Sequence, residues 1–192
     1  MVIRFSKLTR LEELELSRNI FSGGLSDVFG DLGNLKNLNL YGCELTSLPK
    51  SFSKLTLLEE LYLSGNNFSS GLSDVFGGLG NLKKLNLHEC WLKSLPESFS
   101  KLTLLEELGL SGNNFSSGLS DVFGDLGNLK KLNLDTCQLP SLPETFSKLT
   151  RLEELGLSRN NFSSGLSDVF GDLGNLKKLN LDTCKLTSLP ET

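Results

Sequence analysis

The chain has 192 residues, of which 46 are leucine and none is alanine, and a formal net charge of −4 from 19 basic and 23 acidic residues. Because long helices usually draw on alanine, this composition argues against a helical bundle. The balanced charge leaves no electrostatic footprint for nucleic acid or an anionic membrane, and no apolar run approaches the roughly 20 residues of a membrane span. We therefore expect neither as a partner.

The chain is a tandem repeat. The string Phe-Ser-Lys-Leu-Thr first occurs at Phe5 and recurs every 47 residues, so that four units account for residues 5–192. Each unit contains two shorter repeats. The first type reads LxxLxLxxN-x-F and begins at Leu11, Leu58, Leu105 and Leu152. The second type reads LxxLxLxxC-x-L and begins at Leu35, Leu82, Leu129 and Leu176. The starts alternate by 24 and 23 residues, which predicts eight coils in a single domain over residues 1–192.

Each coil is predicted to contain a strand, a turn and a short return segment. In the third coil, period-two alternation points Leu61 and Leu63 inward. Glu60 and Tyr62 then face outward, and stacked coils pair such segments in one parallel sheet. The return segment, for example residues 73–79, is too short and too rich in glycine for a full helix. We expect 3-10 turns or a single helical turn there.

This pattern, repeated eight times in register, is the signature of leucine-rich repeats. The sequence of residues 82–87 and 95–103 resembles the repeats of plant intracellular immune receptors, although no P-loop or signalling domain accompanies these repeats. The resemblance implies an α/β fold: a right-handed, horseshoe-shaped solenoid with a parallel sheet on the concave face and short 3-10 or helical turns on the convex face. It also implies a scaffold that binds a protein or peptide on the concave face.

Charged residues alternate in sign along two rows of the predicted sheet. The third position of successive coils carries Glu13, Asn37, Glu60, Lys84, Glu107, Lys131, Glu154 and Lys178. The second position repeats the alternation, beginning with Glu12 and Lys36. Since neighbouring strands lie about 4.8 Å apart, opposite charges meet side by side. Such a row can dock a charged partner, but the simpler interpretation is that it avoids stacking like charges, each exposed pair contributing less than about 1 kcal/mol.

The ninth position alternates between asparagine and cysteine. Asn19, Asn66, Asn113 and Asn160 are expected to form an asparagine ladder, and Cys43, Cys90, Cys137 and Cys184 fill the same position in the alternate coils. Successive cysteines lie two coils apart, roughly 9.6 Å, which exceeds the Cα separation of about 7 Å that a disulfide allows. A straight row also cannot converge on zinc. We predict buried free thiols and a reducing, cytoplasmic location, or a recombinant protein with no native location.

No catalytic constellation accompanies the repeats. The sole histidine is His88, and no serine or cysteine motif lies beside it. The carboxylates belong to the repeated rows, and equivalent ones such as Asp135 and Asp182 lie two coils apart. We therefore expect no enzyme, no cofactor and no metal site.

The residues that differ between units mark the candidate binding patch. Both tyrosines, the only tryptophan and the only histidine fall on three consecutive coils, within about 10 Å along the sheet. Because tyrosine and tryptophan are favoured anchors in binding hot spots, we predict a concave patch of Tyr41, Tyr62, His88, Glu89 and Trp91. The alternative is that these side chains are inherited from a parent sequence and simply face water. The second half of the chain has glycine at the equivalent positions, Gly109 and Gly156, and so offers a partner few side chains to contact.

The sequence shows no recognisable cap at either end. Val2 and Ile3 are expected to cover the first coil only slightly, and Leu179, Leu181, Leu186 and Leu189 are expected to be under-covered in the last. This predicts end-to-end self-association, or further repeats in a parent protein. The near-identical units favour a designed or consensus array, either a binder or a purely structural array without a native ligand. A fragment of a natural immune-type receptor is the more distant alternative.

Overall fold

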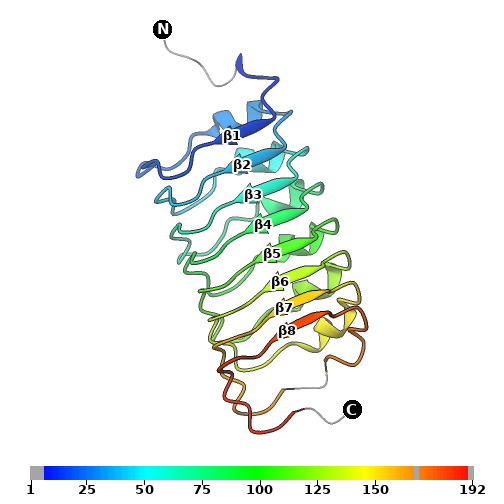
Figure 1. Cartoon of the computed structure of the whole chain (residues 1–192). Coiled ribbons are helices and arrows are strands. Elements are labelled where there is room, and N and C mark those ends of the chain that lie inside the picture. Colours follow the sequence, from blue (N-terminus) through cyan, green and yellow to red (C-terminus); the bar gives the residue numbers. More distant parts are fainter. Residues whose placement is uncertain (1–6, 167–168, 190–192) are drawn as a thin grey trace.

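In the computed structural model, which describes residues 7–166 and 169–189, eight short strands form one sheet (Figure 1). The strands are β1 (Glu13–Glu15), β2 (Asn37–Asn39), β3 (Glu60–Tyr62), β4 (Lys84–Asn86), β5 (Glu107–Gly109), β6 (Lys131–Asn133), β7 (Glu154–Gly156) and β8 (Lys178–Asn180). They follow one another in chain order, and every neighbouring pair is parallel. The predicted solenoid with one strand per coil is confirmed.

The strand register aligns equivalent positions of all the coils. Leu61, for example, lies opposite Leu38 on one side and Leu85 on the other, and all three are buried. The residues before and after each such leucine face outward. We call the surface made by these outward side chains the sheet face; it is the face that the sequence predicts to be concave.

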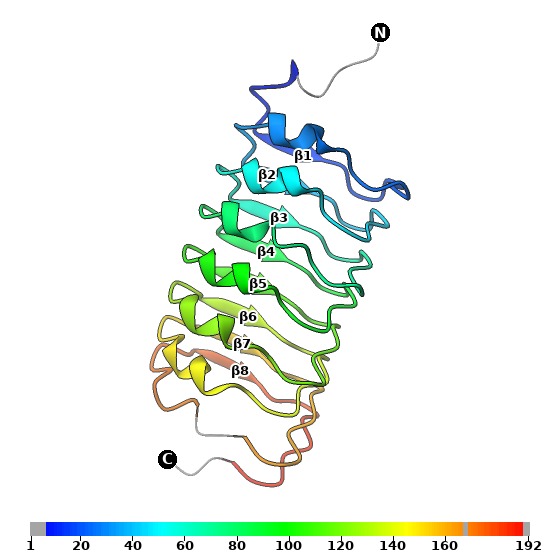
Figure 2. The ribbon, with the colours of Figure 1, turned by 180° about the vertical axis from the view of Figure 1, so that it is seen from behind.

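Short 3-10 helices cover the opposite side of the stack (Figure 2). They are η2 (Asp27–Asp31), η3 (Lys50–Lys54), η4 (Phe76–Gly78), η5 (Glu97–Lys101), η6 (Asp121–Asp125) and η7 (Glu144–Lys148). A proline stands directly before η3, η5 and η7, where its restricted φ suits an extended residue ahead of a turn; at Pro96, φ is −69° and ψ 153°. A leucine follows each helix, and its backbone N–H bonds the phenylalanine carbonyl three residues back. The prediction of 3-10 turns is confirmed.

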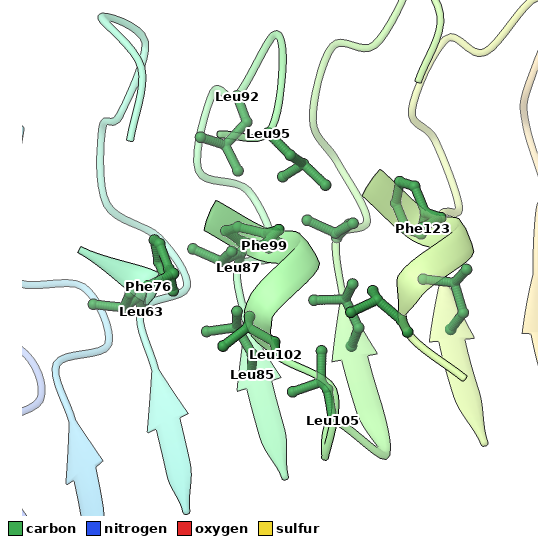
Figure 3. Close-up of a cluster of buried hydrophobic side chains, with 14 of the residues drawn as sticks. Leu63, Phe76, Leu85, Leu87, Leu92, Leu95, Phe99, Leu102, Leu105 and Phe123 are labelled. Carbon is green, nitrogen blue, oxygen red and sulfur yellow. The ribbon is translucent and has the colours of Figure 1, made fainter. Parts of the chain in front are cut away.

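The core is a column of leucine and phenylalanine between the sheet and the 3-10 helices (Figure 3). Phenylalanines of the 3-10 helices pack in pairs, each joining a first-type coil to the second-type coil that follows. The ring centroids of Phe76 and Phe99 lie 4.6 Å apart, and both side chains are fully buried. Aromatic pairs at this distance add about 0.5–1.5 kcal/mol beyond their area burial. The pairs Phe29–Phe52 and Phe123–Phe146 repeat the arrangement.

Buried asparagines join each second-type coil to the first-type coil that follows. Asn113 is 2 % exposed, and its Oδ1 accepts the backbone N–H groups of Cys90 and Leu92. Its Nδ2 donates to the carbonyls of Leu87 and Leu110 at 2.9 and 2.6 Å. Since Asn66 and Asn160 make the equivalent four bonds, the predicted asparagine ladder is confirmed at these three positions. Asn19 does not share the arrangement, because it is exposed and bonds the Leu16 carbonyl of its own coil.

The four cysteines are free and buried. Each Sγ lies within bonding distance of the position-six leucine carbonyl in the preceding coil; from Cys90 Sγ to the Leu63 oxygen the distance is 3.2 Å. Burial raises the pKa of Cys90 and Cys137 to about 11.

This environment predicts unreactive thiols. Because the thiolate is the reactive form, Cys90 and Cys137 are expected to resist a disulfide reagent near pH 8 in the folded protein and to react only after denaturant is added. Counting released thiolate by absorbance checks the prediction. An Ile20→Cys variant supplies the control, since residue 20 is 71 % exposed and its thiol should react at once. Immediate reaction of the native cysteines in folded protein would contradict the assignment.

The last coil is only partly covered within the described residues. Leu179 is 41 % exposed and Leu189 is 70 % exposed, whereas Leu181 and Leu186 are partly buried against the core. The expected covering by Val2 and Ile3 lies outside the described residues.

Candidate functional site

Two rows of ion pairs run along the sheet face. Each pair joins a lysine of a second-type coil to a glutamate of the first-type coil before it. The pairs are Lys36–Glu12, Lys83–Glu59, Lys84–Glu60, Lys130–Glu106, Lys131–Glu107, Lys177–Glu153 and Lys178–Glu154, at 2.7–3.3 Å. The side chains are largely exposed, so each pair contributes about 1 kcal/mol at most. The rows therefore set the charge pattern of the face more than its stability.

The sheet face is hollowed over most of its length, and charged residues of the two rows, among them Lys84, Glu107 and Lys131, form part of the lining. The hollow has a volume of about 780 Å³ and extends from Tyr62 on β3 to Asn180 on β8. Gly109 and Gly156 form part of its lining, because at these strand positions no side chain stands up from the sheet. The sequence predicts few side chains for a partner to contact in the second half of the chain. The structure instead extends the hollow across this half, with Gly109 and Gly156 in its lining.

His88 lies at one end of this hollow and is held by the next coil. Its Nδ1 accepts the backbone N–H of Ser111 at 3.0 Å and lies 2.6 Å from the Ser111 hydroxyl. The ring covers Gly109, where an added Cβ would overlap it. In the next unit Asp135 takes the same role, with Oδ1 2.7 Å from the N–H of Ser158. His88 and Asp135 thus both supply an acceptor to the next coil, whereas the second coil has Tyr41 at the equivalent position.

Burial lowers the pKa of His88 below its usual 6.5, against an opposing influence of the carboxylates of Glu89 and Asp135. A folded-state pKa below the unfolded value means that the stabilisation is present above about pH 6.5 and is lost as pH falls through the folded-state pKa. We expect the free energy of unfolding to decrease between pH 7.5 and pH 5, measured by urea denaturation at each pH. His88→Asn keeps an acceptor without a titrating group and should flatten this decrease. Parallel pH profiles for the two proteins would contradict the assignment.

Tyr62 is fixed against its own strand. Its hydroxyl donates to Glu60 Oε2 at 2.6 Å, and Glu60 Oε1 lies 3.0 Å from Lys84 Nζ. The bond from Tyr62 lowers the pKa of Glu60, and the same bond is the main cause of the raised pKa of Tyr62. The ring is therefore presented to the hollow in one orientation, with its hydroxyl already bonded.

Tyr41 lies apart from His88, in a second depression of about 420 Å³ that it shares with Tyr62 and Arg18. The Arg18 guanidinium stands over its ring, 5.6 Å from the centroid. Tyr62 lines both depressions and so connects them.

Glu89 and Trp91 lie in the turn after β4 and line neither depression. Both have left-handed backbone conformations, with φ of 53° and 59°. Trp91 is 68 % exposed. The five predicted patch residues thus divide into Tyr41 and Tyr62 at one depression, Tyr62 and His88 at the larger one, and Glu89 with Trp91 in the turn beyond the strand. In the described ranges, no group of histidine, cysteine and carboxylate side chains could hold a metal, and no helix there is long and apolar enough to span a membrane.

The profile of the leucine-rich-repeat region family matches residues 73–191, and the profile of the leucine-rich repeat matches residues 9–68. With the eight parallel strands, these matches show that the chain belongs to the leucine-rich-repeat family. No curated protein matches the chain.

Solved structures share the fold. A leucine-rich-repeat protein of Leptospira interrogans is 30 % identical with a TM-score of 0.75, over 96 % of this chain and 52 % of that one. TLR13, solved in complex with a single-stranded RNA, is 31 % identical with a TM-score of 0.80, over 92 % and 26 %. An internalin of Listeria monocytogenes is 20 % identical with a TM-score of 0.67, over 96 % and 58 %. The chain therefore spans about half or less of the first two.

Proposed function

We propose that the chain is a non-enzymatic binding scaffold that takes a polypeptide partner in the hollow of the sheet face. The observation that carries this proposal is the hollow itself: about 780 Å³, with the fixed Tyr62 ring and His88 at one end. Rigid aromatic side chains beside a depression are the usual anchors of protein recognition. The family supports the proposal, since leucine-rich-repeat proteins are in general interaction scaffolds.

The charge pattern of the sheet face favours a polypeptide over a nucleic acid. Each lysine of the two rows, within the described residues, lies beside a glutamate. A phosphate backbone would therefore meet no excess of positive charge, which is the main source of affinity for nucleic acids. The RNA in the TLR13 structure is a partner of that protein.

Filling the hollow tests the proposal. Peptides selected from a displayed random library on the folded protein are expected to lose at least tenfold in affinity on Gly156→Tyr. Tyr62 occupies the equivalent strand position of the third coil. At Gly156 the Asp135 carboxylate, 3.0 Å from an added Cβ, has to move aside, so circular dichroism first verifies that the variant is folded. Gly127→Tyr is the matched control, because Gly127 is exposed and lies outside the hollow. Equal affinity for both variants, or no selectable peptide, would overturn the proposal.

A purely structural array, designed without a native ligand, is the second candidate. The near-identity of the 47-residue units favours this candidate. Their sequence resembles the repeats of plant immune receptors, which supports a parent sequence from that family. Tyr62→Ala and Trp91→Ala distinguish the candidates: a binding module loses affinity for a selected partner, and a structural array has no partner to lose. Adjoining receptor domains in the flanking coding sequence would favour a receptor fragment.

Two further proposals rest on other features. The buried free thiols support a reducing, cytoplasmic location.

The exposed Leu179 and Leu189 support self-association at this end of the stack. Light scattering that gives a 21.0 kDa monomer at high concentration would contradict self-association.

A further inference from the structure

A row of asparagine amides points into the hollow with its acceptors already bonded. Asn86, Asn133 and Asn180 occupy the last position of β4, β6 and β8. Each Oδ1 accepts the backbone N–H two residues further on, at 3.2, 2.9 and 3.0 Å. No Nδ2 of the three has a protein partner in the described part of the chain. We call these three amides the donor row.

The donor row has a period of two coils. The register places Asn86 and Asn133 on either side of Gly109, and Asn133 and Asn180 on either side of Gly156. Two strand spacings amount to about 9.6 Å, so the three donors extend over about 19 Å. A ligand that uses all of them needs hydrogen-bond acceptors repeating at that interval.

Glycines occupy the strand positions between the donors, and side chains of the preceding coil lie over them. The His88 ring covers Gly109 between the first two amides, and the Tyr62 ring lies on the other side of Asn86. At Gly156 the nearest group is the Asp135 carboxylate, whose Oδ1 would lie 3.0 Å from an added Cβ. A polymer chain running across the strands would therefore meet the Tyr62 ring, the His88 ring and the Asp135 carboxylate in turn, alternating with the amide donors.

Among regular polypeptide conformations, polyproline II fits this period. It repeats every three residues, about 9.3 Å, and its carbonyls are free because it has no internal hydrogen bonds. An extended strand repeats at about 6.6 Å, so its carbonyls would miss the middle donor. An α-helix has a pitch of about 5.4 Å and already uses its carbonyls internally.

We propose that the hollow binds a proline-rich segment in the polyproline II conformation, lying along the stack and across the strands. A carbonyl of every third residue accepts from Asn86, Asn133 and Asn180, and proline rings pack on Tyr62 and His88. Proline-rich segments usually bind in grooves lined by aromatic side chains. This inference rests on the proposed function and names the class of its partner.

The test uses an end-capped peptide of nine prolines, which offers only acceptors and is about 28 Å long. Binding is measured by NMR titration of the folded protein, with the side-chain amides of the donor row as reporters. Asn133→Asp keeps an oxygen for the Asp135 N–H but removes the donor, and is expected to weaken binding at least tenfold. Asn39→Asp is the matched control: it has the same bond to Tyr41 N and lies outside the hollow, so affinity should stay within twofold of the original. Circular dichroism verifies the fold of both.

Three results would overturn the inference: no binding of the nine-proline peptide at millimolar concentration, equal binding by Asn133→Asp, or equal binding of a glycine–serine peptide of the same length. These failures are distinguishable from failure of the proposed function. Library peptides that lose affinity on Gly156→Tyr, without proline enrichment, would leave the binding scaffold intact and reject only the polyproline partner. A library that yields nothing, together with no nine-proline binding, would reject both.

Discussion

Asn113→Ala is expected to lower the free energy of unfolding by about 3–5 kcal/mol. The side chain is 2 % exposed and makes four bonds to the backbone of two coils, two as acceptor and two as donor. Alanine leaves the N–H groups of Cys90 and Leu92 and the carbonyl of Leu87 without these partners. Each buried group that loses its partner costs about 1–3 kcal/mol, partly offset where the coil relaxes or water enters.

Urea denaturation followed by circular dichroism measures this effect. Asn19→Ala is the matched control, because Asn19 occupies the same position of the first coil but is exposed and makes one bond, to the Leu16 carbonyl. Its loss should cost less than about 1 kcal/mol. In a stack whose coils contact only their neighbours, Asn113→Ala is also expected to divide the transition into two steps. Similar losses for the two variants would contradict the ladder's role.

Phe99→Ala is expected to destabilise the protein by about 3–5 kcal/mol, the usual cost of a phenylalanine deleted from a core. Phe99 is fully buried on η5, and its ring lies 4.6 Å from that of Phe76. Alanine leaves a cavity between neighbouring 3-10 helices and removes the aromatic pair.

Leu104→Ala is the control for this variant. Leu104 lies five residues further along the same coil and is 44 % exposed, so its truncation should cost about 1 kcal/mol or less. Thermal unfolding of both variants gives the comparison. A melting temperature for Phe99→Ala close to that of the original protein would show that the column of phenylalanines is not the core that the structure describes.

The fold was largely predictable because every coil carries the same pattern of inward and outward residues, so each coil gives the same information about the structure. Leucines at every second residue specify the strand face that points inward. Eight aligned copies can bury this face together only in one parallel stack. Leu61 and Leu85 are accordingly buried and paired in the structure, as expected. The position-nine row was predictable for the same reason. Asparagine and cysteine are both small, and a row two coils apart excludes a disulfide.

The candidate site was less predictable, because recognition depends on the orientation of individual side chains and on their hydrogen bonds, which the strand pattern does not specify. The alternation of asparagine with glycine at the fifth position was present in the sequence, but only the structure shows that Asn133 Oδ1 bonds the Asp135 N–H and turns the amide outward. Likewise, the sequence puts Trp91 three residues from His88. It does not show that the left-handed turn at Glu89 carries Trp91 away from the hollow.

The contacts between coils alternate in kind. Ion pairs and phenylalanine pairs join each first-type coil to its successor, for example Lys84 to Glu60, whereas the buried asparagine bonds join each second-type coil to the next. Salt screens exposed charges and leaves buried neutral bonds almost unaffected. High ionic strength is therefore expected to weaken only the junctions that carry ion pairs. The effect is small there, because buried phenylalanine pairs and contacts such as Cys90 Sγ to the Leu63 carbonyl hold the same junctions without charge.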